Sequence, residues 1–370
     1  MSYFIGGAIA VQNNWKECKL GDIAEIKGGK RLPKGELLVT EKTPHPYIRI
    51  TDFNGHKINL SAIQYVTEEV QKSISRYIVN KQDIIISNVG TIGLCAKIPD
   101  ELDNANLTEN CVKLVFDKNK IDTNFLYYHL ISPDTQELIN GLDVGSTQPK
   151  LPIYNIEKID ISLPPLEEQK AIAEVLSSFD DKIDLLHRQN QTLESLAQTL
   201  FRQWFIEEAK EEWEEKPLSK IADFLNGLAC QKFPPKNDID KLPVLKIKDL
   251  KDGVSENSDY ATSDVKPEYI VNNGDVIFAW SASLMVKIWN GDKCVLNQHL
   301  FKVISKDYPK WFYYQWCKYH LDNFIDIASE HATTMGHIKR SDLDEAICLV
   351  PNIDELDKMT EQFNPIMEKL

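Results

Sequence analysis

The segment LPPLEEQKAIAEVLSSFDDKIDLLHRQNQTLESLAQTLFRQWF, residues 163–205, decides how this chain is organised. Apolar residues recur in it at alternating intervals of four and three, which is the spacing of a coiled-coil seam. Pro164 and Pro165 suit the start of a helix, and the acidic residues that follow complement its dipole. We expect one helix from Leu166 to about Lys210, roughly 65 Å long at about 1.5 Å per residue. The seam consists of Ile172, Leu176, Phe179, Ile183, Leu186, Asn190, Leu193, Ala197, Leu200 and Trp204.

The pattern returns in shortened form at the end of the chain. Residues 350–370, VPNIDELDKMTEQFNPIMEKL, place four residues at seam spacing: Ile353, Leu356, Phe363 and Met367. A long seam needs a partner helix, and the chain returns after an intervening domain, so the two helices would pair antiparallel. Asn190 is either a buried amide that fixes the register of this pair or an edge residue with its amide in solvent.

The second helix is too short to pair along the whole seam. The stripe from Ile172 to Leu186 would therefore have no partner within this chain. Another protein, a second copy through self-association, or the N-terminal segment would cover it. Alternatively, the chain is a truncated and partly defective form.

The chain also contains an internal repeat, offset by about 187 to 198 residues. The first copy contains WKECKLGDIAE, PYIRITDF, KQDIII, LTENCVKLV, FLYYHL and GSTQPKLPIYNIEKIDISLPPLEEQ, which begin at residues 15, 46, 81, 107, 125 and 145. They match WEEKPLSKIAD, PVLKIKDL, NGDVIF, LNQHLFKVI, WFYYQW and ATTMGHIKRSDLDEAICLVPNIDEL in the same order. Six ordered matches indicate duplication of one domain. Within each copy, runs rich in branched residues predict short strands, and the aromatic runs have helical spacing.

These features predict a mixed α/β (α+β) chain, with two duplicated globular domains separated by long helices that form an antiparallel coiled coil. The predicted boundaries are residues 1–163 for the first domain, 164–212 for the central helix, 213–350 for the second domain and 351–370 for the short C-terminal helix. A chain of 370 residues is long enough for two domains with a core each.

Composition indicates an ordinary globular protein of a reducing compartment. No apolar run reaches the roughly 18 residues that cross a bilayer, and the N-terminal stretch lacks the basic start of a secretion signal. We therefore expect no membrane segment and a cytoplasmic location. The seven cysteines are dispersed without metal-ligand spacing, which favours buried thiols over disulfides or a metal site.

The net charge of −14 argues against nucleic acid as a partner, but its distribution weakens that objection. Ten of the excess negative charges lie in the two helical segments, residues 166–216 and 351–370. By contrast, residues 26–50 carry six basic against two acidic side chains, and residues 230–251 carry six against three. Both local surpluses are suited to phosphate.

These residues resemble the specificity subunits of Type I restriction-modification systems. Both copies begin W-(x)4-L-x-(D/K)-I-A-(D/E), and the first ends in a GST loop followed by LPPLEEQ and the heptad helix. The second copy departs from this pattern, with ATTMGHI in place of GSTQPKL. The resemblance covers essentially the whole chain. It implies two target-recognition domains, each of which reads one half of a bipartite double-stranded DNA site, with a stiff helical spacer that fixes the gap between the halves.

The resemblance also implies partners. The helices would dock modification (methyltransferase) subunits, which use S-adenosylmethionine, and a restriction (endonuclease and translocase) subunit that uses ATP and Mg would join them. The chain itself would bind no cofactor or metal, have no catalytic residue, and serve DNA methylation and defence against foreign DNA. The sequence agrees, since it has no G-x-x-x-x-G-K-[S/T], (N/D)PP(Y/F) or H-E-x-x-H motif.

Polar turns in each domain are the candidate DNA contacts, because base edges need forked donors or amides and phosphates need cations or hydroxyls. In the first domain these are Lys27, Lys30, Arg31, Lys34, Arg49, Ser87, Asn88, Thr91, Ser146, Thr147, Gln148 and Lys150. In the second they are Lys232, Lys236, Lys246, Lys248, Trp280, Ser281, Ser283, Thr333, Thr334, His337, Lys339 and Arg340. A solvated surface role is the alternative for each residue taken singly.

A coiled-coil adaptor that binds only proteins is the rival function. It would account for the charge of −14, but it gives no reason for duplicated domains with basic turns. A nuclease would require clustered carboxylates with a lysine near a strand end, and the sequence contains no convincing cluster of that kind.

Overall fold

The computed structural model describes residues 14–144, 148–330 and 336–369. The chain forms two compact units, Met1–Leu185 and Leu186–Leu370. The division falls inside one long helix, α6 (Leu166–Arg202). The helix therefore contributes its first turns to unit 1 and its last turns to unit 2.

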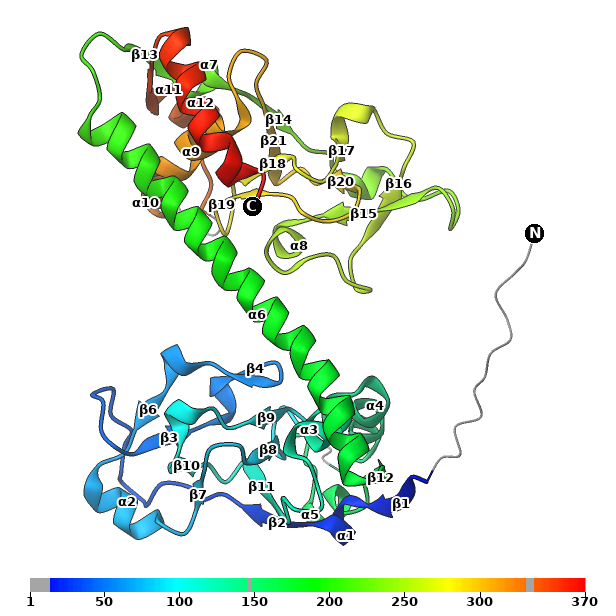
Figure 1. The fold of residues 1–370 in the computed structure, drawn as a ribbon. Helices are drawn as coiled ribbons and strands as arrows, with labels where there is room; N and C mark the ends of the chain where they lie inside the picture. Colours follow the sequence, from blue (N-terminus) through cyan, green and yellow to red (C-terminus); the bar gives the residue numbers. More distant parts are fainter. Residues whose placement is uncertain (1–13, 145–147, 331–335, 370) are drawn as a thin grey trace. The chain divides into compact units, whose positions relative to one another are not determined.

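Unit 1 is built from short strands and helices (Figure 1). Its strands are β1 Lys16–Lys19, β2 Ala24–Gly28, β3 Pro46–Ile48, β4 Phe53–Asn54, β5 Lys57–Ile58, β6 Gln64–Tyr65, β7 Ile78–Val79, β8 Ile84–Ser87, β9 Cys95–Lys97, β10 Ala105–Leu107, β11 Cys111–Phe116 and β12 Asp160–Leu163. Besides α6, its helices are α1 Leu20–Ile23, α2 Glu68–Ile74, α3 Thr123–Ile131, α4 Pro133–Gly141 and α5 Ile153–Ile156.

Unit 2 repeats this plan. Its strands are β13 Glu214–Pro217, β14 Asp223–Asn226, β15 Lys241–Leu245, β16 Tyr260–Thr262, β17 Ile270–Val271, β18 Val276–Ala279, β19 Met285–Ile288, β20 Cys294–Leu296, β21 Leu300–Ile304 and β22 Ile347–Val350. Its helices are α7 Leu218–Ile221, α8 Ile247–Asp252, α9 Lys310–Tyr319, α10 Leu321–Glu330, α11 Arg340–Glu345 and α12 Ile353–Met367.

The two four-stranded sheets of each unit have the same topology, and unit 1 adds the two-stranded sheet β4-β5. Unit 1 has an antiparallel sheet of order β2-β11-β8-β9 and a mixed sheet of order β6-β3-β10-β7, in which β3 and β10 are parallel. Unit 2 has the orders β14-β21-β18-β19 and β16-β15-β20-β17, and again one pair, β15 and β20, is parallel. Each strand of these four-stranded sheets in unit 1 has a counterpart at the same position in unit 2. The duplication predicted from the six sequence blocks is therefore confirmed.

The first and last strands of each unit pair with each other. In unit 1 the first strand, β1, pairs antiparallel with the last, β12, and in unit 2 β13 pairs in the same way with β22. The tryptophan that opens each repeat then donates a hydrogen bond to the helix that leaves the unit. Trp15 Nε1 donates to Glu168 Oε1 at 3.1 Å, and Trp213 Nε1 donates to Glu355 Oε2 at 2.8 Å.

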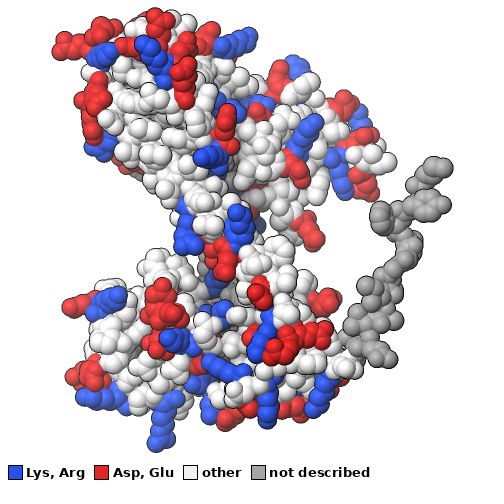
Figure 2. All heavy atoms as spheres, viewed as in Figure 1, with Lys and Arg blue, Asp and Glu red and all other residues white. Residues whose placement is uncertain are grey.

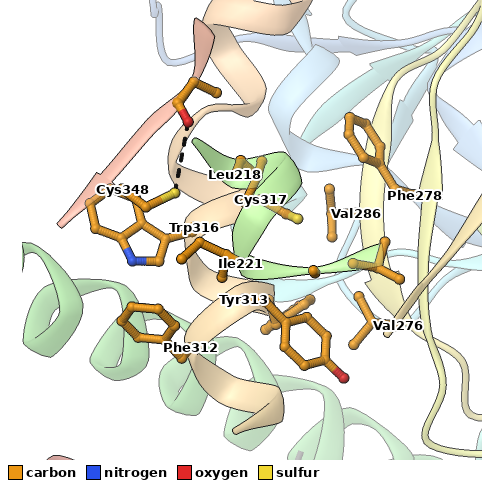
Figure 3. Packing of buried hydrophobic residues seen from close by; sticks show 14 of the residues in the cluster. Leu218, Ile221, Val276, Phe278, Val286, Phe312, Tyr313, Trp316, Cys317 and Cys348 are labelled. Carbon is orange, nitrogen blue, oxygen red and sulfur yellow. Dashed lines mark hydrogen bonds between the residues drawn. The ribbon is translucent and has the colours of Figure 1, made fainter. Parts of the chain in front are cut away.

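The aromatic runs pack inside the units. In unit 2, α9 places Tyr313 beside Val276 of β18 (Figure 3), whereas its Phe312 and Trp316 pack against Phe205, just beyond the end of α6. The counterpart α3 in unit 1 buries Phe125 and Tyr127. These aromatic side chains therefore form the cores, and base stacking is left to other residues.

The central helix begins where the sequence predicts and ends earlier. α6 starts at Leu166, directly after the two prolines, but it ends at Arg202 and continues as a π-helical turn over Gln203–Glu207. Lys210 therefore lies beyond the helix, where its ammonium group forms an ion pair with Glu355. At about 1.5 Å per residue, the 37 residues of α6 span about 55 Å rather than the roughly 65 Å expected.

The end of α6 packs against α12 in the antiparallel sense expected. Trp204 contacts Phe363 with ring centroids 6.0 Å apart, while Lys210, further along the chain, reaches Glu355 at the start of α12. The apolar face is wider than the predicted seam: Phe201 and Phe205, which lie off the seam, are fully buried because this part of the helix also packs against α9.

Most of the seam in the first half of α6 is exposed. Every residue from 181 to 190 is exposed, and this stretch includes Asn190, whose amide thus lies on the surface. We use the name α6 stripe for five exposed apolar residues that share one face of this part of the helix. They are Val175, Leu176, Phe179, Ile183 and Leu186, whereas the exposed Leu185 lies off this face.

The cysteines behave as apolar core residues. All seven are free, and six of them are buried. Burial raises the pKa of the Cys95 thiol to about 12, and that of Cys230 to about 11. At neutral pH these thiols are protonated and unreactive.

The duplication supplies a matched test of where α6 and α12 are buried. Phe363 is fully buried and stacks on Trp311 with ring centroids 4.5 Å apart, whereas its repeat counterpart, Leu176, belongs to the exposed α6 stripe. We expect Phe363→Ala to lower the free energy of unfolding by about 3–5 kcal/mol and Leu176→Ala to change it by less than about 1 kcal/mol. Chemical denaturation followed by tryptophan fluorescence measures both. Equal losses would contradict the difference in burial.

Candidate nucleic-acid interface

Four polar loops of unit 1 are joined by backbone hydrogen bonds. The amide of Asn88 donates to the carbonyl of Asn110 at 2.9 Å, and the carbonyl of Asn88 accepts from Leu151 N at 2.8 Å. Val89 and Lys150 form an isolated antiparallel bridge. We call these four segments the unit 1 loop cluster, which comprises residues 28–34, 87–93, 108–110 and 148–151.

Unit 2 forms the same cluster with the same hydrogen bonds. The amide of Trp280 donates to the carbonyl of His299 at 3.4 Å, and the carbonyl of Trp280 accepts from Ile338 N at 3.1 Å. The isolated bridge is now between Ser281 and His337. The unit 2 loop cluster comprises residues 226–232, 280–285, 297–299 and 336–340.

A glycine fixes the first loop of each cluster against the third. A Cβ atom on Gly29 would lie 1.9 Å from the carbonyl oxygen of Thr108, and one on Gly227 would lie 2.2 Å from that of Asn297. No side chain fits at these distances, so the backbones can approach only because both residues are glycines.

The second loop turns through a left-handed residue in both units. Gly90 has φ +87° in unit 1, and Ala282 takes its place in unit 2 with φ +58°. Their amides donate to Pro149 O at 2.9 Å and Gly336 O at 2.8 Å. The left-handed turn is therefore present in unit 2 although alanine stands there in place of glycine. In both units the turn is hydrogen-bonded to the fourth loop.

The side chains of the unit 1 cluster are charged or amidic. Arg31 Nε donates to Glu109 Oε1 at 2.6 Å, and Lys30 Nζ lies 5.7 Å from the centre of the Tyr77 ring. Asn88 Oδ1 is buried and has no hydrogen-bond donor among the described residues. Base edges and phosphates both need polar groups of this kind.

The unit 2 cluster contains aromatic and imidazole groups that the unit 1 cluster lacks, beside cations such as Lys232 and Lys339. The half-buried Trp280 ring stacks on Phe301 at 5.5 Å, and the rings of His299 and His337 lie 6.0 and 6.4 Å from it. Trp280 Nε1 donates to Asn226 Oδ1 at 3.2 Å. The two units therefore present different chemistry on one shared scaffold.

The structure places fifteen of the 24 predicted contact residues in the two clusters. In the clusters lie Lys30, Arg31, Lys34, Ser87, Asn88, Thr91, Gln148, Lys150, Lys232, Trp280, Ser281, Ser283, His337, Lys339 and Arg340. Ser146, Thr147, Thr333 and Thr334 lie outside the described residues. Lys27, Arg49, Lys236, Lys246 and Lys248 lie outside the clusters as defined here.

Two arginines of the predicted set hold structure. The guanidinium of Arg49 donates to Asp52, which is fully buried, and to the carbonyl of Ala62 at 3.0 Å. Arg340 donates to the carbonyl of Phe224 at 3.0 Å and lies over the Phe301 ring. Arg49 thereby engages all three of its guanidinium nitrogens, and Arg340 engages Nη2. Among the lysines, Lys27, Lys236 and Lys246 form ion pairs with neighbouring acids.

Sequence reasoning missed the third loop of each cluster. Glu109 and Asn110 in unit 1, and Gln298 and His299 in unit 2, lie within the matched blocks LTENCVKLV and LNQHLFKVI. The signal was a polar run inside an apolar block, at the junction between the strands of two sheets.

Charge is mixed over the described surface. Figure 2 shows basic and acidic side chains interspersed over both units on the visible face. Within residues 14–144, 148–330 and 336–369, no group of three or more His, Cys, Asp or Glu side chains is placed to hold a metal ion. No helix in this part of the chain is long and apolar enough to cross a membrane.

The fold and the duplicated clusters define a protein with two related recognition modules joined by a helix. Residues 12–195 and 210–365 each match the sequence model of the Type I restriction modification DNA specificity domain. The chain therefore belongs to this family.

Similar proteins agree with this assignment. The chain is 26% identical to the Type I restriction enzyme MjaIX specificity subunit of Methanocaldococcus jannaschii, over 97% of this chain and 88% of that protein. It is 26% identical to the HindI specificity subunit of Haemophilus influenzae, over 53% of this chain and 41% of that protein. The crystal structure of a Type I restriction-modification S subunit from M. genitalium has the same fold, with a TM-score of 0.55 and 16% identity, over 98% of this chain and 97% of that one.

The close approach at Gly29 predicts a sharp difference between adjacent glycines. An alanine at Gly29 would place its Cβ 1.9 Å from a backbone oxygen, whereas an alanine at Gly28 would meet nothing within 4 Å. We expect Gly29→Ala to displace the loop, lower the melting temperature and weaken DNA binding at least tenfold, and Gly28→Ala to leave both close to wild type. Thermal unfolding and a binding titration measure the effects, and equal behaviour of the two variants would contradict the packing.

Proposed function

We propose that each unit of this specificity subunit reads one half of a bipartite DNA site through its loop cluster. The observation that carries the proposal is that one scaffold, kept by equivalent backbone hydrogen bonds, presents different side chains in the two units. A duplicated reader with changed reading groups suits a site whose two halves differ in sequence. The chain then contributes recognition, and partner subunits contribute catalysis.

We further propose that α6 sets the gap between the half-sites. A continuous helix is stiff, and its length adds about 1.5 Å per residue. Linking two readers in this way also raises the effective concentration of the second reader once the first is bound.

The partners follow from the same proposal. Methyltransferase subunits that use S-adenosylmethionine would dock on the helices, and a restriction subunit that uses ATP and Mg would join them, while this chain binds no cofactor. The α6 stripe supports helix docking, since Phe179 is 62% exposed and Ile183 is 49% exposed. Large apolar side chains grouped on one helix face are typical of an interaction surface. Self-association through the same stripe is the competing use.

Sequencing of methylated DNA tests the function. In a host that expresses the chain with its methyltransferase subunits, we expect methylation at a split motif with a fixed gap. Duplicating residues 183–189 of α6 inserts one exposed heptad, about 10 Å of helix, and turns the following residues by only about 20°. The gap should then grow by about three base pairs, since one base pair rises about 3.4 Å.

A flexible insertion of equal length provides the control. Seven glycine and serine residues between Val254 and Ser255, in an exposed loop of unit 2, should leave the gap unchanged. An unsplit motif, or none, would refute the proposed function. A split motif whose gap keeps its wild-type length after the heptad is inserted would refute only the role of α6.

Charge on the α6 stripe should prevent docking. We expect Phe179→Lys combined with Ile183→Lys to abolish copurification of the methyltransferase subunits, because two ammonium groups would have to be buried in the interface. The pair Gln189→Lys and Gln191→Lys adds the same charge at exposed polar positions of α6 and should keep binding. Circular dichroism checks that both variants remain folded. Retained binding by the stripe variant would show that the partners dock elsewhere.

A further inference from the structure

Comparison of the two units distinguishes contacts that the fold requires from contacts that occur in only one unit. Backbone contacts shared by both units belong to the scaffold. The amide of Lys30 donates to Leu107 O at 2.8 Å, and the amide of Leu228 donates to Leu296 O at the same distance. Hence Arg31 corresponds to Ala229, and by the same register Glu109 corresponds to Gln298.

Unit 2 cannot form an ion pair that corresponds to the one between Arg31 and Glu109, because it lacks charged residues at the two equivalent positions. Alanine and glutamine occupy the two positions there, yet the loop keeps the same backbone hydrogen bonds and the same close glycine contact. The scaffold therefore does not need this ion pair. An exposed ion pair also contributes little to stability, typically below about 1 kcal/mol.

The geometry of the pair leaves the arginine fork open. Arg31 is bound through Nε, which donates to Glu109 Oε1 at 2.6 Å, and its side chain is 80% exposed. No described residue accepts a hydrogen bond from Nη1 or Nη2. The two terminal nitrogens thus form a free planar pair of donors at the surface of the cluster.

Glu109, which accepts the hydrogen bond from Arg31, is itself held by a second hydrogen bond. Thr108 Oγ1 donates to the other oxygen of Glu109 at 3.1 Å, and Thr108 itself is buried. Partial burial opposes ionisation of Glu109, but hydrogen bonds, chiefly from Arg31, hold the pKa of Glu109 below its usual value. On the other side, Tyr47 Oη donates to Lys30 O at 2.7 Å, one residue before Arg31.

The position of Glu109 distinguishes between two possible acceptors. A phosphate that approached the fork would bring its negative charge close to the carboxylate, which disfavours the contact. A neutral base edge meets no such repulsion. Guanine presents two acceptors, O6 and N7, in the major groove, whereas adenine presents one acceptor and one donor there.

We propose that Arg31 reads a guanine in the half-site bound by unit 1, with Glu109 as the residue that positions its guanidinium. The inference rests on the proposed function and names one base contact within it. The forked contact predicts a preference for guanine over other bases of about 5- to 150-fold at one position.

Selection from a pool of duplex DNA with randomised positions tests the assignment. The full chain is assembled with its methyltransferase subunits, and bound duplexes are sequenced. We expect wild type to select a split motif with an invariant guanine in one half. Arg31→Ala should lose the preference at that position alone, and Arg31→Lys should also lose it while keeping most of the affinity. Glu109→Gln should weaken the preference, because the fork is held less firmly.

Lys34→Ala provides the matched control, since it removes a cation from the same cluster without a forked donor. It should lower affinity equally for all sequences and leave the motif intact. If Arg31→Ala selects the wild-type motif and only reduces the salt dependence of binding, Arg31 contacts phosphate and the assignment is wrong. If wild type itself selects no motif, the proposed function fails and the assignment fails with it.

Discussion

The structure depends on how each unit closes on itself. The strand that opens a repeat pairs with the strand that ends it, and the opening tryptophan is hydrogen-bonded to the departing helix through Glu168 in unit 1 and Glu355 in unit 2. Because its first and last strands pair with each other, each unit has its own sheets and its own hydrophobic core. Duplication of such a unit needs only a linking segment, and α6 supplies it by ending one unit and completing the core of the next.

Because closure and scaffold are shared, the loop clusters could diverge without loss of the fold. Gly29 and Gly227 keep the backbone approach on which the clusters depend, and equivalent amide–carbonyl pairs hold the other loops. The exposed Arg31 side chain is not needed for packing. Arg31 and Glu109 in unit 1 could therefore differ from Ala229 and Gln298, their counterparts in unit 2. Under the proposed function, two unlike half-sites require this combination of a fixed backbone and variable side chains.

Sequence patterns predicted the fold more fully than the site. The six ordered blocks yielded the duplication, and the heptad spacing yielded the start of α6 and the antiparallel contact with α12. Periodicity could not reveal that Phe201 and Phe205 would be buried off the seam, since that burial comes from packing against α9, a contact distant in sequence. At the site, residue type alone could not separate Arg31, whose fork is open, from Arg49, whose donors are used by Asp52 and Ala62.

The net charge of −14 fits a protein that selects sequence rather than one that merely binds DNA. Non-specific affinity comes from the phosphates and grows with the number of cations in contact. An acidic chain gains little non-specific affinity from phosphate contacts. The acidic residues concentrated in the helical segments reduce this affinity further. Under the proposed function, binding then depends on the few polar groups proposed to meet base edges and on cations of the proposed partner subunits. A weak electrostatic background widens the difference between a correct site and a random one, which is the property that a specificity subunit requires.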